Sequence, residues 1–256
     1  MQLTENLPVT ENNDNAPNNT MEWGKVVILL GLAGYFAWII VNGDLNNYIN
    51  VRFVWLSYVA VALFILLGGA NLYGILQSKK GQYKRLEHTT LSWTVLMIVA
   101  VPLVLGTLIP SEPLGAESIN GTISTNAYVL NRATQVTRDP LERNVLEWLR
   151  VFNNGTPSSF NGNPADVVGF VYREPGFGDD IFMVARFTLS CCVADASAIG
   201  VPATFPAGTD LTIGDGEWVR VTGVFEAGDF RGAQTPILIV DTIEVIEQPE
   251  HPYLYP

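Results

Sequence analysis

Residues 53–78 read FVWLSYVAVALFILLGGANLYGILQS and contain no charged side chain. Residues 26–43 and residues 89–111 are likewise free of charge. About 20 apolar residues in a helix, each rising about 1.5 Å, cross the hydrocarbon core of a bilayer. The three stretches therefore predict transmembrane helices at about residues 26–43, 53–76 and 91–109, within a membrane region of residues 24–111. For any one stretch, the alternative is a buried helix of a soluble domain.

The cationic residues of the loops predict how the helices are oriented. The loop of residues 77–90 contains four of them, Lys79, Lys80, Lys84 and Arg85, whereas the loop of residues 44–52 contains only Arg52. Short cationic loops stay in the cytoplasm. We therefore expect a multi-pass protein of the cell membrane whose N-terminus is cytoplasmic and whose residues after Ser111 are extracytoplasmic. The Asn-rich residues 1–23 are predicted to form a disordered cytoplasmic tail.

The net negative charge of the chain lies entirely in its second part. The formal net charge is −11 over 256 residues, and residues 112–256 contain eight Arg, no Lys and 19 acidic side chains. Nucleic acids select Lys and Arg through their phosphates, so this composition excludes nucleic acid as an expected partner. The apolar helices contain no ionisable residue, and ion pathways are normally built from such groups. They are thus expected to anchor the chain in the bilayer.

Residues 139–256 are expected to form an exterior, mainly β domain, after a linker of residues 112–138. Asp139, Pro140 and Glu142 match the start of an amphipathic helix of about three turns that ends at Asn153. Strand-like stretches follow at residues 165–174, 181–189, 201–205, 217–225 and 236–246. Five short strands separated by turn residues suggest a small barrel or sandwich. Gly169 and Gly223, inside strands, fit the bends of a barrel, so we predict an OB-like barrel with one added helix.

The two cysteines of the chain, Cys191 and Cys192, are adjacent. One interpretation is a structural pair, as buried thiols or as a vicinal disulfide, which would be strained because adjacent Cα atoms lie about 3.8 Å apart. A second is a site for a soft metal ion, Cu(I) or Zn(II), with Asp195 as a further ligand. The third is thiol redox exchange, in which a nearby Arg186 could lower a thiol pKa.

Other chemical signals in the sequence are weak. The two histidines, His88 and His251, lie far along the chain from the cysteines, and His88 is expected on the opposite side of the membrane. Acidic residues in Gly-rich loops, namely Asp179, Asp180, Asp210 and Asp215, could bind a cation, although solvated turn residues are the more common explanation. The sequence contains no phosphate-binding loop and no hydrolase or metalloprotease motif. We therefore do not expect an enzyme.

Five stretches carry a resemblance to a known family. They are residues 48–53 (YINVRF), 169–173 (GFVYR), 186–196 (RFTLSCCVADA), 218–223 (WVRVTG) and 252–256 (PYLYP). From about residue 24 onwards the chain resembles the YcgQ-like bacterial membrane proteins, a family with a domain of unknown function that is provisionally described as permease subunits. The resemblance implies an exterior domain, a separate multi-spanning permease subunit as partner, transport connected with metal ions, and two helices in the minimal form.

These observations lead to one expected function and two alternatives. We expect a non-enzymatic accessory subunit of a permease, whose exterior domain binds a metal ion or another small solute, with Cys191, Cys192 and Asp195 as candidate ligands. The first alternative is a membrane-anchored thiol redox or sensor protein that uses the same cysteines. The second is an exterior domain with a purely structural or stabilising role.

Overall fold

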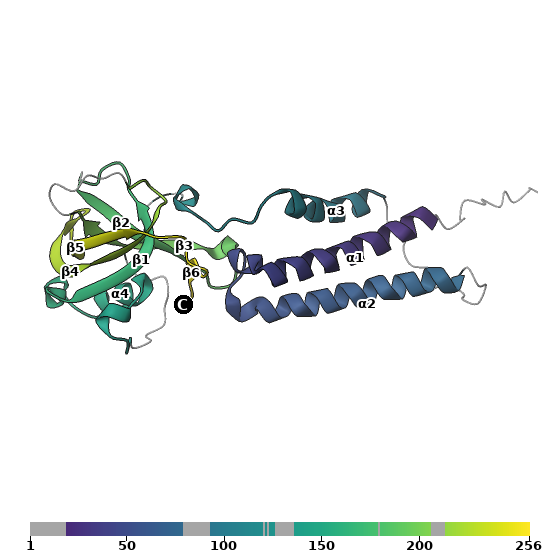
Figure 1. Ribbon diagram of the computed structural model, residues 1–256, viewed down its shortest axis with the longest axis horizontal. Coiled ribbons are helices and arrows are strands. Elements are labelled where there is room, and N and C mark those ends of the chain that lie inside the picture. Colours follow the sequence, from purple (N-terminus) through teal and green to yellow (C-terminus); the bar gives the residue numbers. More distant parts are fainter. Residues whose placement is uncertain are drawn as a thin grey trace, which may run out of the picture. The chain divides into compact units, whose positions relative to one another are not determined.

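The computed structural model describes residues 19–78, 93–119, 121, 123–125, 136–178, 180–205 and 213–256. These residues form two compact units (Figure 1). A helical unit contains the described residues up to Asn42 together with Trp55–Pro110, and a β unit contains Gly43–Val54 and Ser111–Pro256. Residues 1–18, which make up most of the predicted tail, lie outside the described residues. Residues 79–92 also lie outside them, and they include most of the cationic loop of residues 77–90.

Two helices of the helical unit are long enough to cross a membrane. Helix α1 (Asn19–Asn42) has 24 residues and α2 (Val54–Ser78) has 25, so each is about 36 Å long. Each has exposed aromatic side chains towards both ends, Trp23 and Trp38 on α1 and Trp55 and Tyr73 on α2. Such pairs, about 22–27 Å apart along a helix, are typical of the two interfaces of a bilayer. Length, apolar composition and flanking aromatics together indicate membrane spans.

The predicted third span is wrong. Helix α3 (Trp93–Leu108) has 16 residues and contains Pro102, and at about 24 Å it is shorter than the ~30 Å hydrocarbon core. The charge-free stretch of residues 89–111 is longer than this helix, because residues 109–111 already lie outside it. Among the described residues, only α1 and α2 have the length and hydropathy of a span.

Glycines allow α3 to approach α1 closely. A Cβ atom built on Gly24 would lie 2.8 Å from Leu96, and one built on Gly31 would lie 3.1 Å from Leu103. The two leucines of α3 thus fill the space that a side chain at either glycine would occupy. This is the small-residue packing expected between helices in a membrane. There the hydrophobic effect does not drive helices together, and van der Waals packing at close approach does.

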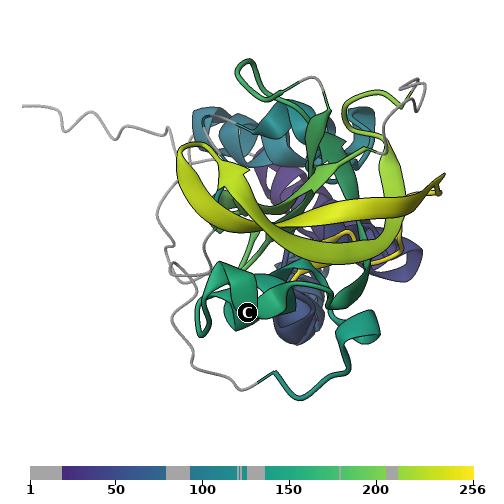
Figure 2. The same cartoon turned by 90° about the vertical axis from the view of Figure 1, so that its left-hand side faces the viewer.

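The described part of the β unit contains six strands, five of which pair in a closed cycle. The strands are β1 (Pro164–Tyr172), β2 (Ile181–Thr188), β3 (Ser197–Thr204), β4 (Trp218–Phe230), β5 (Ala233–Val245) and β6 (Tyr253–Leu254). Antiparallel pairings join β1 to β2, β2 to β3, β5 to β4 and β4 to β1, and β3 pairs with β5 in parallel. The short β6 pairs with β2 outside this cycle. Figure 2 shows the long hairpin of β4 and β5 curving across the unit. A mainly β second domain is thereby confirmed.

Two glycines permit neighbouring strands to approach each other closely. The β4–β5 register shifts between Thr222 and Gly223, where a Cβ on Gly223 would overlap the carbonyl group of Ile239. At Gly169 a Cβ would lie 2.6 Å from the carbonyl oxygen of Ala185. Strand β1 begins to pair with β2 at the next residue, Phe170. Both positions thus require the absence of a side chain where strands come close.

The helix of the β unit begins later than predicted. Pro140–Glu142 form the short 3-10 turn η5, and Asp139 makes no capping hydrogen bond through its side chain. Helix α4 (Val145–Phe152) instead begins after Asn144, which forms a capping box with Glu147. The extended backbone of Arg143 separates the two turns. The predicted end at Asn153 is confirmed.

Both faces of β2 are buried, so the β unit has two hydrophobic clusters. Phe182 and Val184 point into a cluster with Trp148 of α4, whereas Met183 and Phe187 belong to a second one. Residues before β1 and after β5 complete the second cluster, including Ile123 and Tyr253, which are both buried. The described part of the predicted linker 112–138 therefore supplies core residues of the β unit.

Candidate functional site

The turn between β2 and β3 brings the three predicted site residues together. Asp195 ends the short 3-10 turn η7 (Val193–Asp195) and its carboxylate points back along the chain. It accepts hydrogen bonds from the backbone N–H groups of Ser190 at 3.2 Å, Cys191 at 2.8 Å and Cys192 at 3.3 Å. The role of Asp195 in this structure is thus to hold the backbone of the cysteine turn.

The cysteine side chains are two free thiols in contact. The Sγ atoms of Cys191 and Cys192 are 3.7 Å apart, far longer than the ~2.05 Å of a disulfide bond. Cys191 is exposed and Cys192 is partly buried. The pair is therefore accessible from solvent. In this structure the two cysteines do not form a vicinal disulfide.

The surroundings of Cys191 favour the protonated thiol. Its hydrogen bonds to Asp195 and to Cys192 raise the pKa of Cys191 to about 11. Partial burial acts to raise the pKa of Asp195, but the hydrogen bonds from Cys191, Cys192 and Ser190 outweigh it, so the pKa of Asp195 lies below its usual value. A reactive thiol needs a lowered pKa. The electrostatics of the turn are thus opposite to those of a redox-active cysteine.

Arg186 does not act on the thiols. Its guanidinium group is buried and donates hydrogen bonds to the carbonyl oxygens of Pro252 at 2.9 Å, His251 at 2.7 Å and Val168 at 3.3 Å. It also stacks on the ring of Trp218. Burial lowers the pKa of Arg186 to about 10. This side chain ties the C-terminal segment to strands β1 and β2, so the suggestion that it activates a thiol is wrong.

A residue that the sequence reasoning missed holds the cysteine turn from the other side. Asn50 lies in the loop between α1 and α2, and it is only 1% exposed. Its side-chain amide donates to the carbonyl oxygens of Leu189 at 3.2 Å and Ser190 at 2.9 Å. Its backbone N–H donates to the carbonyl oxygen of Cys191 at 3.0 Å. The only sequence signal for it was its place in the stretch YINVRF that carries the family resemblance.

Backbone pairing extends the contact on both sides of Asn50. Ile49 forms an antiparallel bridge with Cys192, and the N–H of Val193 donates to the carbonyl oxygen of Tyr48 at 2.9 Å. The loop of residues 43–54 therefore adds a short strand-like segment to the cysteine turn. It belongs to the β unit, whereas the sequence placed it in the membrane region of residues 24–111.

The C-terminal segment joins the same loop. The hydroxyl of Tyr253 accepts a hydrogen bond from the N–H of Leu114 at 2.8 Å and donates to the carbonyl oxygen of Asn47 at 3.2 Å. Arg52 donates to the carbonyl oxygen of Pro256 at 3.1 Å. Leu114 and the C-terminal segment thus meet at the loop of residues 43–54, which holds the cysteine turn.

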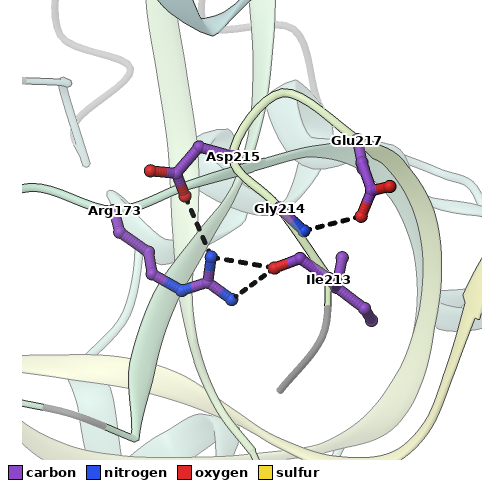
Figure 3. A network of polar contacts seen from close by, with 5 residues as sticks. All are labelled: Arg173, Ile213, Gly214, Asp215 and Glu217. Atoms are coloured by element: carbon purple, nitrogen blue, oxygen red, sulfur yellow. Dashed lines mark hydrogen bonds and ion pairs between the residues drawn. The ribbon is translucent and has the colours of Figure 1, made fainter.

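The candidate ligands that the structure describes elsewhere in the chain do not form a metal site with the cysteines. Within the described residues, no group of three or more His, Cys, Asp or Glu side chains is arranged to hold a metal ion. His88 lies outside those residues, as do Asp179 and Asp210. Asp215 is paired with Arg173, whose guanidinium also donates to the carbonyl oxygen of Ile213 (Figure 3). That carboxylate therefore stabilises a loop by an ion pair.

Comparison with known proteins identifies the family. Residues 25–123 match the DUF1980 N-terminal domain and residues 124–256 match the DUF1980 C-terminal domain. The UPF0703 protein YcgQ of Bacillus subtilis is 20% identical over 282 aligned residues, covering 90% of this chain and 98% of that protein. A Streptococcus mutans protein, provisionally named a two-component membrane permease complex subunit, is 24% identical, with 90% and 99% covered. The resemblance inferred from the sequence is confirmed, and the chain belongs to the DUF1980 family.

Proposed function

We propose that this chain is the non-enzymatic accessory subunit of a two-component membrane permease. Its helices α1 and α2 lie in the membrane beside a separate multi-spanning subunit, and its β unit lies on the extracytoplasmic side. The observation that carries the proposal is the contact of Asn50 with Leu189, Ser190 and Cys191. Because Asn50 lies in the short loop between the two spans, this contact supports a β unit that lies at one membrane face.

The composition of the spans supports a partner subunit. Residues 26–42 of α1 and all of α2 contain no Asp, Glu, Lys, Arg or His. Pathways for ions and polar solutes are normally lined by such residues. A translocation path would then belong to the other subunit. The name of the Streptococcus relative describes that protein as one subunit of a two-component permease complex.

We propose that the β unit is an OB-like barrel. The closed cycle of pairings β1–β2–β3–β5–β4–β1 supports this proposal, with β3 and β5 as the parallel pair. The close strand contact at Gly169 of β1 and the register shift at Gly223 of β4 are also typical of a small barrel. Its excess of acidic side chains would attract cations rather than nucleic acid.

The thiol pair is proposed as the point at which the subunit contacts its solute, a soft metal ion such as Cu(I) or Zn(II). Two sulfur ligands at ~2.3 Å from a tetrahedral ion lie about 3.8 Å apart, and the Sγ atoms of Cys191 and Cys192 are 3.7 Å apart. The carboxylate of Asp195 already accepts three N–H groups, so its proposed role is to position the thiols. Two protein ligands leave positions open, as transfer to another subunit would require.

Co-purification tests the subunit assignment. The tagged full chain, extracted from membranes of its own organism in a mild detergent, is expected to bring down a multi-spanning protein in a fixed ratio. An unrelated protein with two spans and the same tag controls for shared lipid. Recovery of the chain alone under conditions that preserve other membrane complexes would refute the assignment.

Metal analysis tests the role of the thiols separately. The purified full chain is equilibrated with Zn(II), or with Cu(I) under reducing conditions, and bound metal is measured by mass spectrometry. We expect the wild type to retain metal that the double variant Cys191→Ser/Cys192→Ser does not retain. In Asp195→Asn the binding is expected to persist, because both sulfurs remain. Equal metal content in all three proteins would exclude the pair as ligands.

A structural role of the turn is the second candidate. It is favoured by the three hydrogen bonds to Asp195 and by the buried amide of Asn50, which stabilise the turn without any ligand. In that case, Cys191→Ser/Cys192→Ser would leave metal content and partner binding unchanged. The raised pKa of Cys191 counts against the redox alternative, and a metal ion would likewise have to displace the thiol proton on binding.

A further inference from the structure

The β unit exposes few large apolar side chains, and most of them lie in one short stretch. Among its described residues, the large hydrophobic side chains that are exposed belong to Tyr48, Val51, Phe53, Leu141 and Val245. The first three occur within six consecutive positions, and each is 38% exposed. Leu141 and Val245 stand alone in the chain, whereas these three lie in one short stretch, so the stretch is a candidate contact surface. We call Tyr48, Val51 and Phe53 the apolar loop cluster.

The backbone beneath the apolar loop cluster is held firmly. The side-chain oxygen of Asn50 accepts the N–H of Arg52 at 3.0 Å, which caps the 3-10 turn η2 (Val51–Phe53). The carbonyl oxygen of Asn50 accepts the N–H of Phe53 at 2.8 Å. Asn50 therefore points into the protein while Val51 and Phe53 are displayed on the outside. The exposure of these apolar groups is a property of an ordered turn.

The position of the loop in the chain indicates what covers the cluster. Helix α1 ends at Asn42, immediately before the loop, and α2 begins at Val54, immediately after Phe53. Both helices have the length and hydropathy of membrane spans. At the start of α2, directly after the cluster, the aromatic side chains of Trp55 and Tyr58 are also exposed. Aromatic side chains at the end of a span lie at the level of the lipid headgroups.

We propose that the apolar loop cluster inserts into the headgroup region of the bilayer and seats the β unit on the membrane surface. The lipid surface is the single occupant proposed. Because the same loop is hydrogen-bonded to the cysteine turn, the thiol of Cys191 then lies at the membrane surface rather than out in the aqueous phase. The proposal depends on α1 and α2 being in the membrane, but not on the partner subunit or on metal binding.

Site-directed spin labelling of the full chain tests this proposal. The chain is reconstituted alone into phosphatidylcholine/phosphatidylglycerol vesicles, in the Cys191→Ser/Cys192→Ser background. Labels are attached at Tyr48→Cys and Phe53→Cys, and the control label at Asp180→Cys. Asp180 is exposed and precedes β2, whereas the cysteine turn follows that strand, so the control lies about 30 Å from the turn along the strand. Accessibility is measured to oxygen, which partitions into lipid, and to a water-soluble nickel chelate.

We expect the ratio of oxygen to nickel accessibility to be higher at both loop positions than at Asp180→Cys. A label on native Cys191, in Cys192→Ser, provides a second reading without any change in the loop, and it is expected to give an intermediate ratio. Nickel accessibility at the loop positions equal to that at Asp180→Cys would overturn the proposal. Low accessibility to both reagents would also overturn it, because protein rather than lipid would then cover the cluster.

Discussion

The backbone N–H of Asn50 donates a hydrogen bond to the carbonyl oxygen of Cys191 at 3.0 Å. One residue precedes the second membrane helix, and the other follows the second strand of the β unit. The contact makes the loop between the two long apolar helices part of the β unit. The stretches YINVRF and SCCVADA, which both resemble the family, thus lie on the two sides of one contact.

Removal of the Asn50 side chain should destabilise the β unit. In Asn50→Ala the buried carbonyl groups of Leu189 and Ser190 lose their donor, which costs about 1–3 kcal/mol of unfolding free energy. Chemical unfolding of the purified full chain in detergent measures this. Asn154→Ala is the matched control, because Asn154 also donates to a carbonyl group but is exposed, and its effect should be within about 0.5 kcal/mol. Equal effects would show that the Asn50 contacts do not stabilise the fold.

Loss of the Asp195 charge should make Cys191 more acidic. The hydrogen bond to this carboxylate is the largest cause of the raised pKa of Cys191, so in Asp195→Asn that pKa should fall from about 11 towards its ordinary value. The ultraviolet absorbance of the thiolate, followed against pH in a Cys192→Ser background, measures the change. Faster alkylation by iodoacetamide at neutral pH should accompany it. An unchanged titration would mean that Asp195 does not contact the thiol in solution.

The contribution of Asp195 to stability should disappear in acid. Its pKa in the folded chain is depressed by the N–H groups that it accepts, so the carboxylate stabilises the fold above its unfolded pKa of about 3.9, and this is lost as the pH falls through the folded value. The difference in Tm between wild type and Asp195→Asn should therefore shrink on acidification. Asp241→Asn, which removes a charge from an exposed site of β5, should show no comparable convergence.

A side chain at Gly223 should not be tolerated. The added Cβ of Gly223→Ala would overlap the backbone carbonyl of Ile239, which cannot move without breaking the β4–β5 ladder. Overpacking of this kind costs about 1–3 kcal/mol, and thermal unfolding of the full chain should show it. Gly214→Ala is the control, since its Cβ would be no closer than 3.8 Å to a neighbour. Similar Tm values for the two variants would contradict the close approach.

Replacement of Arg186 by lysine should release the C-terminal segment. A lysine cannot reproduce the fork that reaches Val168, His251 and Pro252, and each charged hydrogen bond that is lost costs about 1.5–3 kcal/mol. Hydrogen exchange of residues 251–256 should therefore be faster in Arg186→Lys. The control Arg220→Lys alters an exposed ion pair with Asp166 and should leave this exchange unchanged. Unaltered exchange in both variants would show that Arg186 does not hold the segment.

Local sequence patterns predicted which helices and strands exist better than they predicted the residues at which these begin and end. The five predicted strands all exist, because each contains its own run of apolar and β-branched residues, but β4 and β5 extend to the tight turn at Arg231 and Gly232. The start of α4 was misplaced because Asp139-Pro140 suits a 3-10 turn as well as a helix, and the capping box of Asn144 prevailed. The third span was overestimated because hydropathy does not show where a helix ends.

The sequence by itself determined that this protein has apolar membrane helices followed by an acidic, mainly β domain, and which residues carry the thiols. Hydropathy, charge and strand alternation are properties of neighbouring residues, so they can be read along the chain. Only the tertiary structure decided that Asp195 holds backbone N–H groups, that Arg186 binds carbonyl groups, and that Asn50 supports the cysteine turn. Each of these polar groups finds its partner when folding brings distant segments together, and a local pattern does not specify which distant carbonyl or N–H group a buried side chain will meet.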